Sequence, residues 1–293
     1  MYYLVYSFLW LISLLPFRVM YLFSDLIYFP VFYFFKYRKD IVMNNLQIAF
    51  PEKTEKERIQ LAKIFYHNLI DTFLESIKFI TLSKKQILKR SSGEFELINA
   101  LAAKGYNIHI MAGHQFNWEY GNLLFSMNLS IPFVGVYMPI SNKILDKIFF
   151  NFRKKYGTVL IPATDFRNKM HSIFTKQYSL ALAADQNPGD PTNAYWMNYF
   201  GRPAPFLTGP ARGAVKNNTA VVIVGFKKIK RGYYHFSTKL ITENGSLFTP
   251  EQLTVLYKNE MEEIIRKDPA NYLWSHRRWK YEWKPAYGNL IKE

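Results

Sequence analysis

The chain has 293 residues, enough for one large domain or two small ones, and its 49% hydrophobic and 20% charged residues exclude an intrinsically disordered protein. The sequence contains no cysteine, which excludes disulfides, thiolate zinc sites and a cysteine nucleophile. The formal charge of +16 predicts an anionic partner, with nucleic acid, an acidic membrane, a phosphorylated substrate and an acidic carrier protein as candidates.

The first forty residues are rich in aromatic side chains, which lie inside long apolar runs rather than among lysines. This arrangement favours a membrane over nucleic acid, since nucleic-acid binders combine aromatic and basic residues in one patch. The sequence shows no helix-turn-helix, zinc-finger or RNP-like segment, so a nucleic-acid binder is the weaker alternative. The two apolar runs cover residues 2–17 and 19–35, and neither clearly reaches the ~20 residues of a straight membrane span.

This N-terminal segment has three interpretations. A cleaved signal peptide requires a basic start and a small-residue cleavage site, and neither is present. A buried helical hairpin and a membrane anchor, spanning or interfacial, remain. We favour the anchor because Lys36, Arg38 and Lys39 follow the apolar stretch directly, which places the rest of the chain in the cytoplasm. The expected organisation is a membrane-associated segment over residues 1–36 and an α/β domain over residues 37–293.

A helix is predicted from Thr54 to about Ile80. Thr54 and Glu57 have the spacing of a capping box, in which each side chain satisfies a free amide at the start of the helix. Apolar residues then recur every fourth position and predict one buried stripe. The stripe consists of Leu61, Phe65, Leu69, Phe73 and Ile77.

After Gly105 the pattern changes to short apolar runs separated by polar or helical stretches. These runs predict strands at 107–112, 133–137, 158–161, 178–184, 219–226 and 233–241. Strands that alternate with helices indicate an α/β fold with a mixed or mostly parallel sheet flanked by helices. Residues 187–218 contain several Gly and Pro with little periodicity, so we expect a long loop that serves as a lid or a binding surface.

The first of these strands ends just before His114, in a turn where α/β proteins commonly bind ligands. Asn117 is expected to cap a helix that begins at Trp118, with Glu119 in its first turn. Glu119 would then hold one imidazole nitrogen and leave the other to take a proton, as in a catalytic triad whose nucleophile is an acceptor hydroxyl. The plainer alternatives are a surface ion pair and a satisfied core histidine. His109 suggests a metal, but without an H-E-x-x-H segment or cysteines we expect none.

Three further polar clusters have candidate roles. Asp185 and Gln186 follow another predicted strand and point to the same edge of the sheet. Arg153 precedes a strand, and its guanidinium can neutralise a phosphate or a developing oxyanion. Residues 274–280 combine tryptophans with Arg277 and Arg278, which suits a phosphorylated headgroup at a membrane interface or, alternatively, a solvated C-terminal helix.

Together and in this order, these segments resemble the bacterial lipid A late acyltransferases, the lauroyl- and myristoyltransferases with a glycerolipid-acyltransferase-like fold. The likeness covers nearly the whole chain. It is carried by His114 and Glu119 within GHQFNWEYGN, by Arg153, by Asp185-Gln186, by Phe200-Gly201 and Thr208-Gly209, and by the ending from Trp274 to Lys280.

The resemblance implies an inner-membrane enzyme, facing the cytoplasm, that transfers a fatty acyl group from a thioester to a hydroxyl of a lipid A precursor without metal or cofactor. The donor is typically an acyl-acyl carrier protein, whose acidic surface fits the +16 charge, although coenzyme A stays open. The implied catalytic pair is His114 and Glu119. The implied substrate-binding residues are Arg153, Asp185, Gln186, Thr208, Arg277 and Arg278.

Two alternatives remain. Asn187-Pro188 departs from the pattern of many relatives, which leaves open an acceptor of another class, such as an aminolipid or a glycolipid. A non-enzymatic alternative is an inactive, basic membrane-scaffold protein, which would tolerate the loss of His114.

Overall fold

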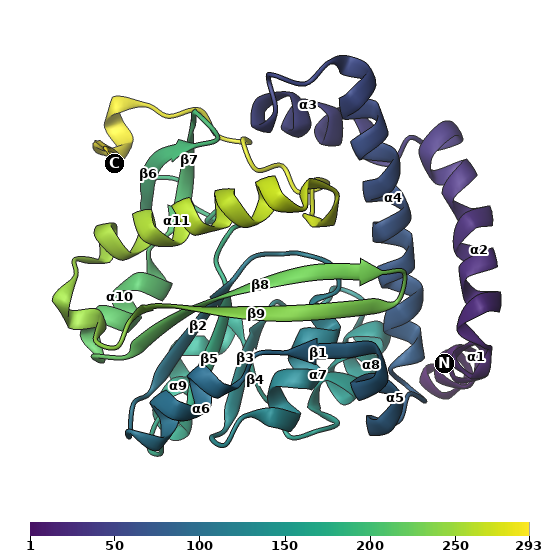
Figure 1. Cartoon of the computed structure of the whole chain (residues 1–293), viewed down its shortest axis with the longest axis horizontal. Coiled ribbons are helices and arrows are strands. Elements are labelled where there is room, and N and C mark those ends of the chain that lie inside the picture. The colour runs from purple at the N-terminus through teal and green to yellow at the C-terminus, as the bar shows by residue number, and fades with distance from the viewer. Residues whose placement is uncertain (293) are drawn as a thin grey trace.

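The computed structural model describes residues 1–292, apart from the side chain of Ser172, and has a seven-stranded sheet at its centre (Figure 1). The strand order is β1-β9-β8-β2-β5-β3-β4, and every neighbouring pair is parallel except β8 with β9. The strands are β1 Ser91–Gly93, β2 Ile108–Ala112, β3 Phe133–Tyr137, β4 Val159–Pro162, β5 Ser179–Ala183, β8 Ala220–Lys230 and β9 Tyr233–Thr242. The predicted mostly parallel α/β fold is confirmed, and each of the six predicted apolar runs forms a strand.

Helices cover both faces of this sheet. Alternate strand residues point to opposite faces, so Ile110 packs toward one core and Met111 toward the other. The first core lies against α6 Glu96–Ala103 and α7 Trp118–Asn128, and the second lies against α4 Glu55–Lys78 and α11 Pro250–Lys267. The remaining helices of this domain are α3 Lys39–Ala49, α5 Lys84–Arg90, α8 Lys143–Lys154, α9 Phe166–Ile173 and α10 Gly209–Lys216, with short 3-10 turns at Ala163–Asp165, Gly245–Leu247, Pro269–Asn271 and Pro285–Tyr287.

The segment predicted as a long loop contains regular structure, so that prediction is wrong over much of 187–218. It holds the hairpin β6 Ala194–Tyr199 and β7 Arg202–Leu207, which pairs with β10 Leu290–Ile291, and it ends in helix α10. The second strand was not predicted because it contains Pro203 and Pro205, which usually argue against a strand. They are tolerated because β7 lies at the edge of its three-stranded sheet, where a missing N–H donor breaks no ladder.

Helix α4 begins with the predicted capping box: Thr54 Oγ1 accepts from the Glu57 amide at 3.3 Å, and Glu57 Oε2 accepts from the Thr54 amide at 2.7 Å. The predicted stripe is only partly right. Phe65 and Leu69 are buried, but Phe73 is 59% exposed. Phe73 lies in an apolar groove between α4 and the N-terminal helices, so the stripe does not face one continuous core.

The N-terminal segment forms α1 Tyr2–Leu14, α2 Phe17–Phe29 and a π-helical turn, η1 Pro30–Phe34. Helix α2 lies along α4 (Figure 1). It exposes five large apolar side chains, Leu22, Phe23, Leu26, Ile27 and Phe29. Within the described residues, one helical stretch, 17–34, is long and apolar enough to cross a membrane: it has 18 residues, a mean hydropathy of 1.2, and 22% of it is buried.

The inner face of α2 combines the buried apolar side chains Met20 and Tyr28 with polar groups. Ser24 donates a hydrogen bond to Asp71 of α4 at 2.7 Å, and Arg231 at the β8–β9 turn pairs with both Asp71 and Asp25. A helix whose inner face carries bonded polar groups and whose outer face exposes large apolar side chains differs from an ordinary core helix. The segment is therefore attached to the α/β domain by specific polar contacts.

Candidate active site

His114 and Asp185 meet at the carboxyl edge of the central sheet. Strands β2 and β5 are adjacent and parallel, with Ala112 opposite Ala183, so the residues that follow them emerge side by side. His114 Nδ1 lies 2.7 Å from one carboxylate oxygen of Asp185, and the His114 backbone amide donates to the other at 3.0 Å. The prediction that these two clusters share one edge of the sheet is confirmed.

The electrostatics of this pair fix the histidine tautomer. The Asp185 side chain is 2% exposed and that of His114 is 25% exposed. An ionised carboxylate only accepts hydrogen bonds, so Nδ1 carries the shared proton and Nε2 is left to accept another. Burial lowers the pKa of His114, but the charge and hydrogen bond of Asp185 outweigh burial and raise it overall. Burial raises the pKa of Asp185, but contact with His114 dominates and holds it at about 2.

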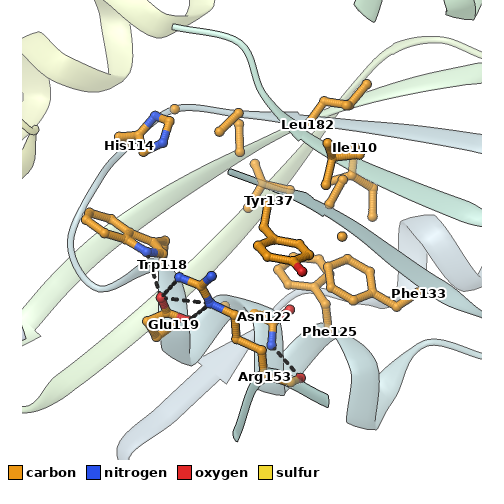
Figure 2. A pocket seen from close by; sticks show the side chains of 18 of the residues that line it. Ile110, His114, Trp118, Glu119, Asn122, Phe125, Phe133, Tyr137, Arg153 and Leu182 are labelled. Carbon is orange, nitrogen blue, oxygen red and sulfur yellow. Dashed lines mark hydrogen bonds and ion pairs between the residues drawn. The ribbon is translucent and has the colours of Figure 1, made fainter. Parts of the chain in front are cut away.

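Glu119 does not hold the imidazole, and that prediction is wrong. Its carboxylate forms a bidentate ion pair with Arg153: Nε lies 2.9 Å from one oxygen and 3.1 Å from the other, which also accepts from Nη2. Trp118 also donates its indole N–H to Glu119 at 3.1 Å. The ring of Trp118 packs edge-on against His114, with 5.7 Å between centroids, and lies between His114 and Glu119 in Figure 2.

The reason lies in the start of helix α7. Asn117 caps the helix as predicted, because its side-chain oxygen accepts from the Glu119 amide at 3.0 Å. The cap fixes Glu119 in the first turn, with its carboxylate directed toward the end of α8 rather than back along the loop. Arg153 sits at that end, and its pKa is raised by Glu119 although burial opposes this.

A cavity of about 300 Å³ opens beside these residues (Figure 2). His114, Trp118, Glu119 and Arg153 form its polar wall. The remaining lining is mostly apolar and comes from β2, β3, β4, β5, β8 and α7 and the residues next to them: Ile110, Ala112, Gly113, Gly121, Asn122, Phe125, Phe133, Gly135, Val136, Tyr137, Met138, Leu160, Ala181, Leu182, Ala183, Val224 and Phe226. A space of this kind suits a flexible apolar chain whose reactive end stays near His114.

Most of these lining residues were missed by sequence reasoning. A signal was present in β5, which reads Ser-Leu-Ala-Leu-Ala, and in Gly135 of the neighbouring strand. Small residues on adjacent strands leave space that larger residues would fill. Since a small residue in a strand is also common in tight packing, the pattern alone does not distinguish a cavity from a close contact.

The other predicted substrate-binding residues lie outside the cavity. Thr208 is at the start of α10, Gln186 is half-buried after Asp185, and Arg277 is exposed. Arg278 is 1% exposed, so the prediction that it presents its charge to a headgroup is wrong. Its guanidinium lies over the ring of Phe206, 4.3 Å from the centroid, and donates to Asn187 at 2.9 Å.

Arg278 nevertheless connects to the site through Asn187. The Asn187 backbone amide donates to His276 at 3.2 Å, and its side chain donates to the Arg277 carbonyl at 2.6 Å. The loop that carries Asp185 is thus bonded to the C-terminal segment. Within residues 1–292, no three His, Cys, Asp or Glu side chains are grouped so as to hold a metal ion.

Comparison with known proteins identifies the family. The family model described as bacterial lipid A biosynthesis acyltransferase matches residues 1–281. A lipid A biosynthesis acyltransferase of Haemophilus influenzae is 23% identical over 91% of this chain and 83% of its own length. The lipid A biosynthesis lauroyltransferase of Escherichia coli is 23% identical over 93% of this chain and 89% of its own, and the palmitoleoyltransferase of the same organism is 22% identical over 93% and 88%. The chain therefore belongs to the bacterial lipid A biosynthesis acyltransferase family, and it is an acyltransferase.

Proposed function

We propose that this enzyme transfers a fatty acyl group from a thioester to a hydroxyl of a lipid A precursor, with His114 as the general base and Asp185 as the residue that orients it. The observation that carries the proposal is the 2.7 Å contact between His114 Nδ1 and the buried Asp185, at the edge of an apolar cavity. It directs the second imidazole nitrogen away from the carboxylate, where a substrate hydroxyl can approach.

One side chain, His114, carries the proton through both steps of the proposed reaction. His114 Nε2 takes the proton of the acceptor hydroxyl as its oxygen attacks the thioester carbonyl. Collapse of the tetrahedral intermediate forms the ester bond and breaks the carbon–sulfur bond. The imidazolium then returns its proton to the thiolate, which leaves as a thiol. Asp185 stabilises the positive charge that His114 carries between these two steps.

The cavity supports the assignment of the acyl donor. Its apolar lining excludes water from a hydrocarbon chain, and the polar wall would keep the thioester beside His114. A chain seated in this way presents its carbonyl to the acceptor in a fixed orientation, which removes much of the entropic cost of bringing two substrates together. No part of the hydrocarbon chain needs to contact a charged group.

Glu119 has a different role from the one that spacing suggested, whereas Arg153 keeps its predicted role. Arg153 lines the cavity, so we propose that it stabilises either the developing oxyanion or a phosphate of a substrate. Glu119 fixes the guanidinium because one carboxylate oxygen accepts from Arg153 Nε and the other from Arg153 Nη2, a geometry that specifies orientation as well as charge. Glu119 is then a positioning residue for Arg153. Gln186, Thr208 and Arg277 remain candidates for contacts to the acceptor outside the cavity.

We further propose that the enzyme acts at the cytoplasmic face of the inner membrane, with an acyl-acyl carrier protein as donor. The exposed apolar face of α2, followed by Lys36, Arg38 and Lys39, supports membrane attachment with the domain on the positive side. The +16 charge supports recognition of an acidic carrier. The names of the relatives, a lauroyltransferase and a palmitoleoyltransferase of lipid A biosynthesis, support a lipid A precursor as acceptor.

A transfer assay tests this proposal. Purified full-length protein is mixed with a lipid A precursor and either acyl-acyl carrier protein or acyl-coenzyme A, and the acylated lipid is detected by mass spectrometry. We expect product with the carrier protein and a lower kcat/KM with coenzyme A, which lacks an extended acidic surface. Salt should raise KM for the carrier protein, because exposed charges are screened over about 8 Å at physiological ionic strength. No product with either donor would overturn the substrate assignment.

A further inference from the structure

A buried carboxylate outside the cavity, Glu75 of α4, is not used by the proposed mechanism. Its side chain is 1% exposed, and it accepts hydrogen bonds from three neutral donors. Tyr21 of α2 donates to one oxygen at 2.7 Å, while Tyr234 of β9 and Asn117 donate to the other at 2.7 Å and 3.0 Å. Among the ion pairs formed by residues 1–292, none includes Glu75.

The contact with Asn117 connects Glu75 to the active site. The Asn117 side chain is fully buried, and both of its ends are bonded. Its amide nitrogen donates to Glu75, and its oxygen accepts from the backbone amide of Glu119. An amide group has one donor end and one acceptor end, so these two partners fix its orientation. Asn117 lies in the chain between His114 and Glu119.

A carboxylate at this position is costly for the fold. Burial raises the pKa of Glu75, which shows that the low-polarity surroundings disfavour its charged form. An apolar side chain of similar size would avoid that cost, and removal of buried polar groups in favour of apolar ones is often neutral or stabilising. It would, however, leave the Asn117 amide and the Tyr21 and Tyr234 hydroxyls without their acceptor. One of the three groups that require a polar residue here thus belongs to the loop that carries His114.

We propose that Glu75 is a positioning residue for the acyl transfer. By holding Asn117, it fixes the turn that carries His114 and the first turn of α7 that carries Glu119. The bond from Tyr21 extends this support to α2, so the N-terminal segment and the active-site turn share one buried anchor. The inference rests on the proposed function, since acyl transfer is the activity that reports on it.

The test compares three variants of the full-length enzyme. Glu75→Leu removes the acceptor, and we expect kcat to fall about 10-fold or more, with KM for the donor little changed, because small displacements of a catalytic group have large effects on rate. Glu75→Gln should restore most of the activity: its oxygen can accept from Asn117 and Tyr234, and its amide can donate to the Tyr21 oxygen. Ser76→Ala is the matched control, since Ser76 is buried on the same helix and, among the residues that the structure describes, its hydroxyl bonds only to the carbonyl of Thr72.

A double variant shows whether Glu75 acts through Asn117. Residues that act as one unit have non-additive effects, so Glu75→Leu with Asn117→Ala should lose little more kcat than Asn117→Ala alone. The inference would be overturned if the losses of kcat in the two single variants multiplied in the double variant. It would also be overturned if Glu75→Leu kept wild-type kcat, or if its loss of activity matched its loss of folded protein. Failure of the proposed function is distinguished by His114→Ala: an active His114→Ala enzyme contradicts the mechanism, whatever the Glu75 variants do.

Discussion

Asp185 and His114 are 71 positions apart in the chain, yet their side chains are joined at 2.7 Å. The parallel register of β2 and β5 accounts for this contact, since it brings the ends of two distant strands to the same edge of the sheet. Asp185 is buried and bonded to both the ring and the backbone of His114. The carboxylate that serves the histidine therefore comes from the neighbouring strand and not from the adjacent helix.

Asp185→Asn should lower kcat on the order of 100-fold or more, because an amide cannot stabilise the imidazolium. It should also change the pH profile. In the wild type Asp185 outweighs burial and raises the pKa of His114, and His114 must be neutral to take a proton, so kcat/KM falls as the pH drops through that raised value. Without the charge, burial prevails and lowers the pKa. The acidic limb of the kcat/KM profile should move to lower pH, and an unchanged limb would contradict the pairing.

Glu119→Gln should reduce activity by loosening Arg153 while leaving the acidic limb of the pH profile in place, since Glu119 is not bonded to His114. Arg153→Lys should be as harmful, because an ammonium group cannot reproduce the bidentate contact. Kinetic profiles of the two variants across pH check both statements. If Glu119→Gln moved the limb as Asp185→Asn does, Glu119 would have to act on His114 directly.

Gly135→Leu should shift the acyl preference toward shorter chains. Gly135 lines the cavity, and an added Cβ would meet its neighbours at 3.5 Å or more, so the backbone tolerates a side chain there. The larger residue then occupies space that a long acyl chain needs. A series of donors of increasing chain length measures this, with kcat/KM falling most for the longest. A uniform loss across the series, with the melting temperature retained, would show that the chain does not enter this cavity.

Leu22→Glu with Leu26→Glu should release protein from membranes. Both side chains are exposed on α2, at 64% and 66%, so the substitutions cost little folding energy but place charges on the proposed attachment face. Leu247→Glu is the matched control, because Leu247 is also exposed but lies in the α/β domain. Sedimentation of cell lysates compares the three proteins. Equal membrane fractions would contradict attachment through this face of α2.

The fold was largely predictable because its determinants are local. Each predicted apolar run became a strand, and Thr54 and Asn117 cap helices as their spacing indicated. The prediction failed at β7 because Pro203 and Pro205 argue against a strand in the sequence. An edge strand tolerates them, but the sequence does not show that this strand lies at an edge.

The position of the site in the fold was predictable from the sequence, but the partners of its charged side chains were not. That His114 and Asp185 share one edge follows from strand periodicity and parallel order. That Glu119 pairs with Arg153 depends on where the end of α8 packs, which no local pattern determines. Arg278 is similar: its burial requires the aromatic rings of Tyr199 and Phe206, and these come from the hairpin that was missed.

The most direct test of the central claim is the rate of acyl transfer by purified His114→Ala, compared with that of His235→Ala. His235 is partly exposed on β9, bonds to Ser92 and does not line the cavity, so its variant controls for the loss of an imidazole. With saturating donor and acceptor, we expect His114→Ala to be slower by roughly 100-fold or more, the scale on which a general base contributes, and His235→Ala to match the wild type. Wild-type turnover by folded His114→Ala would contradict the account.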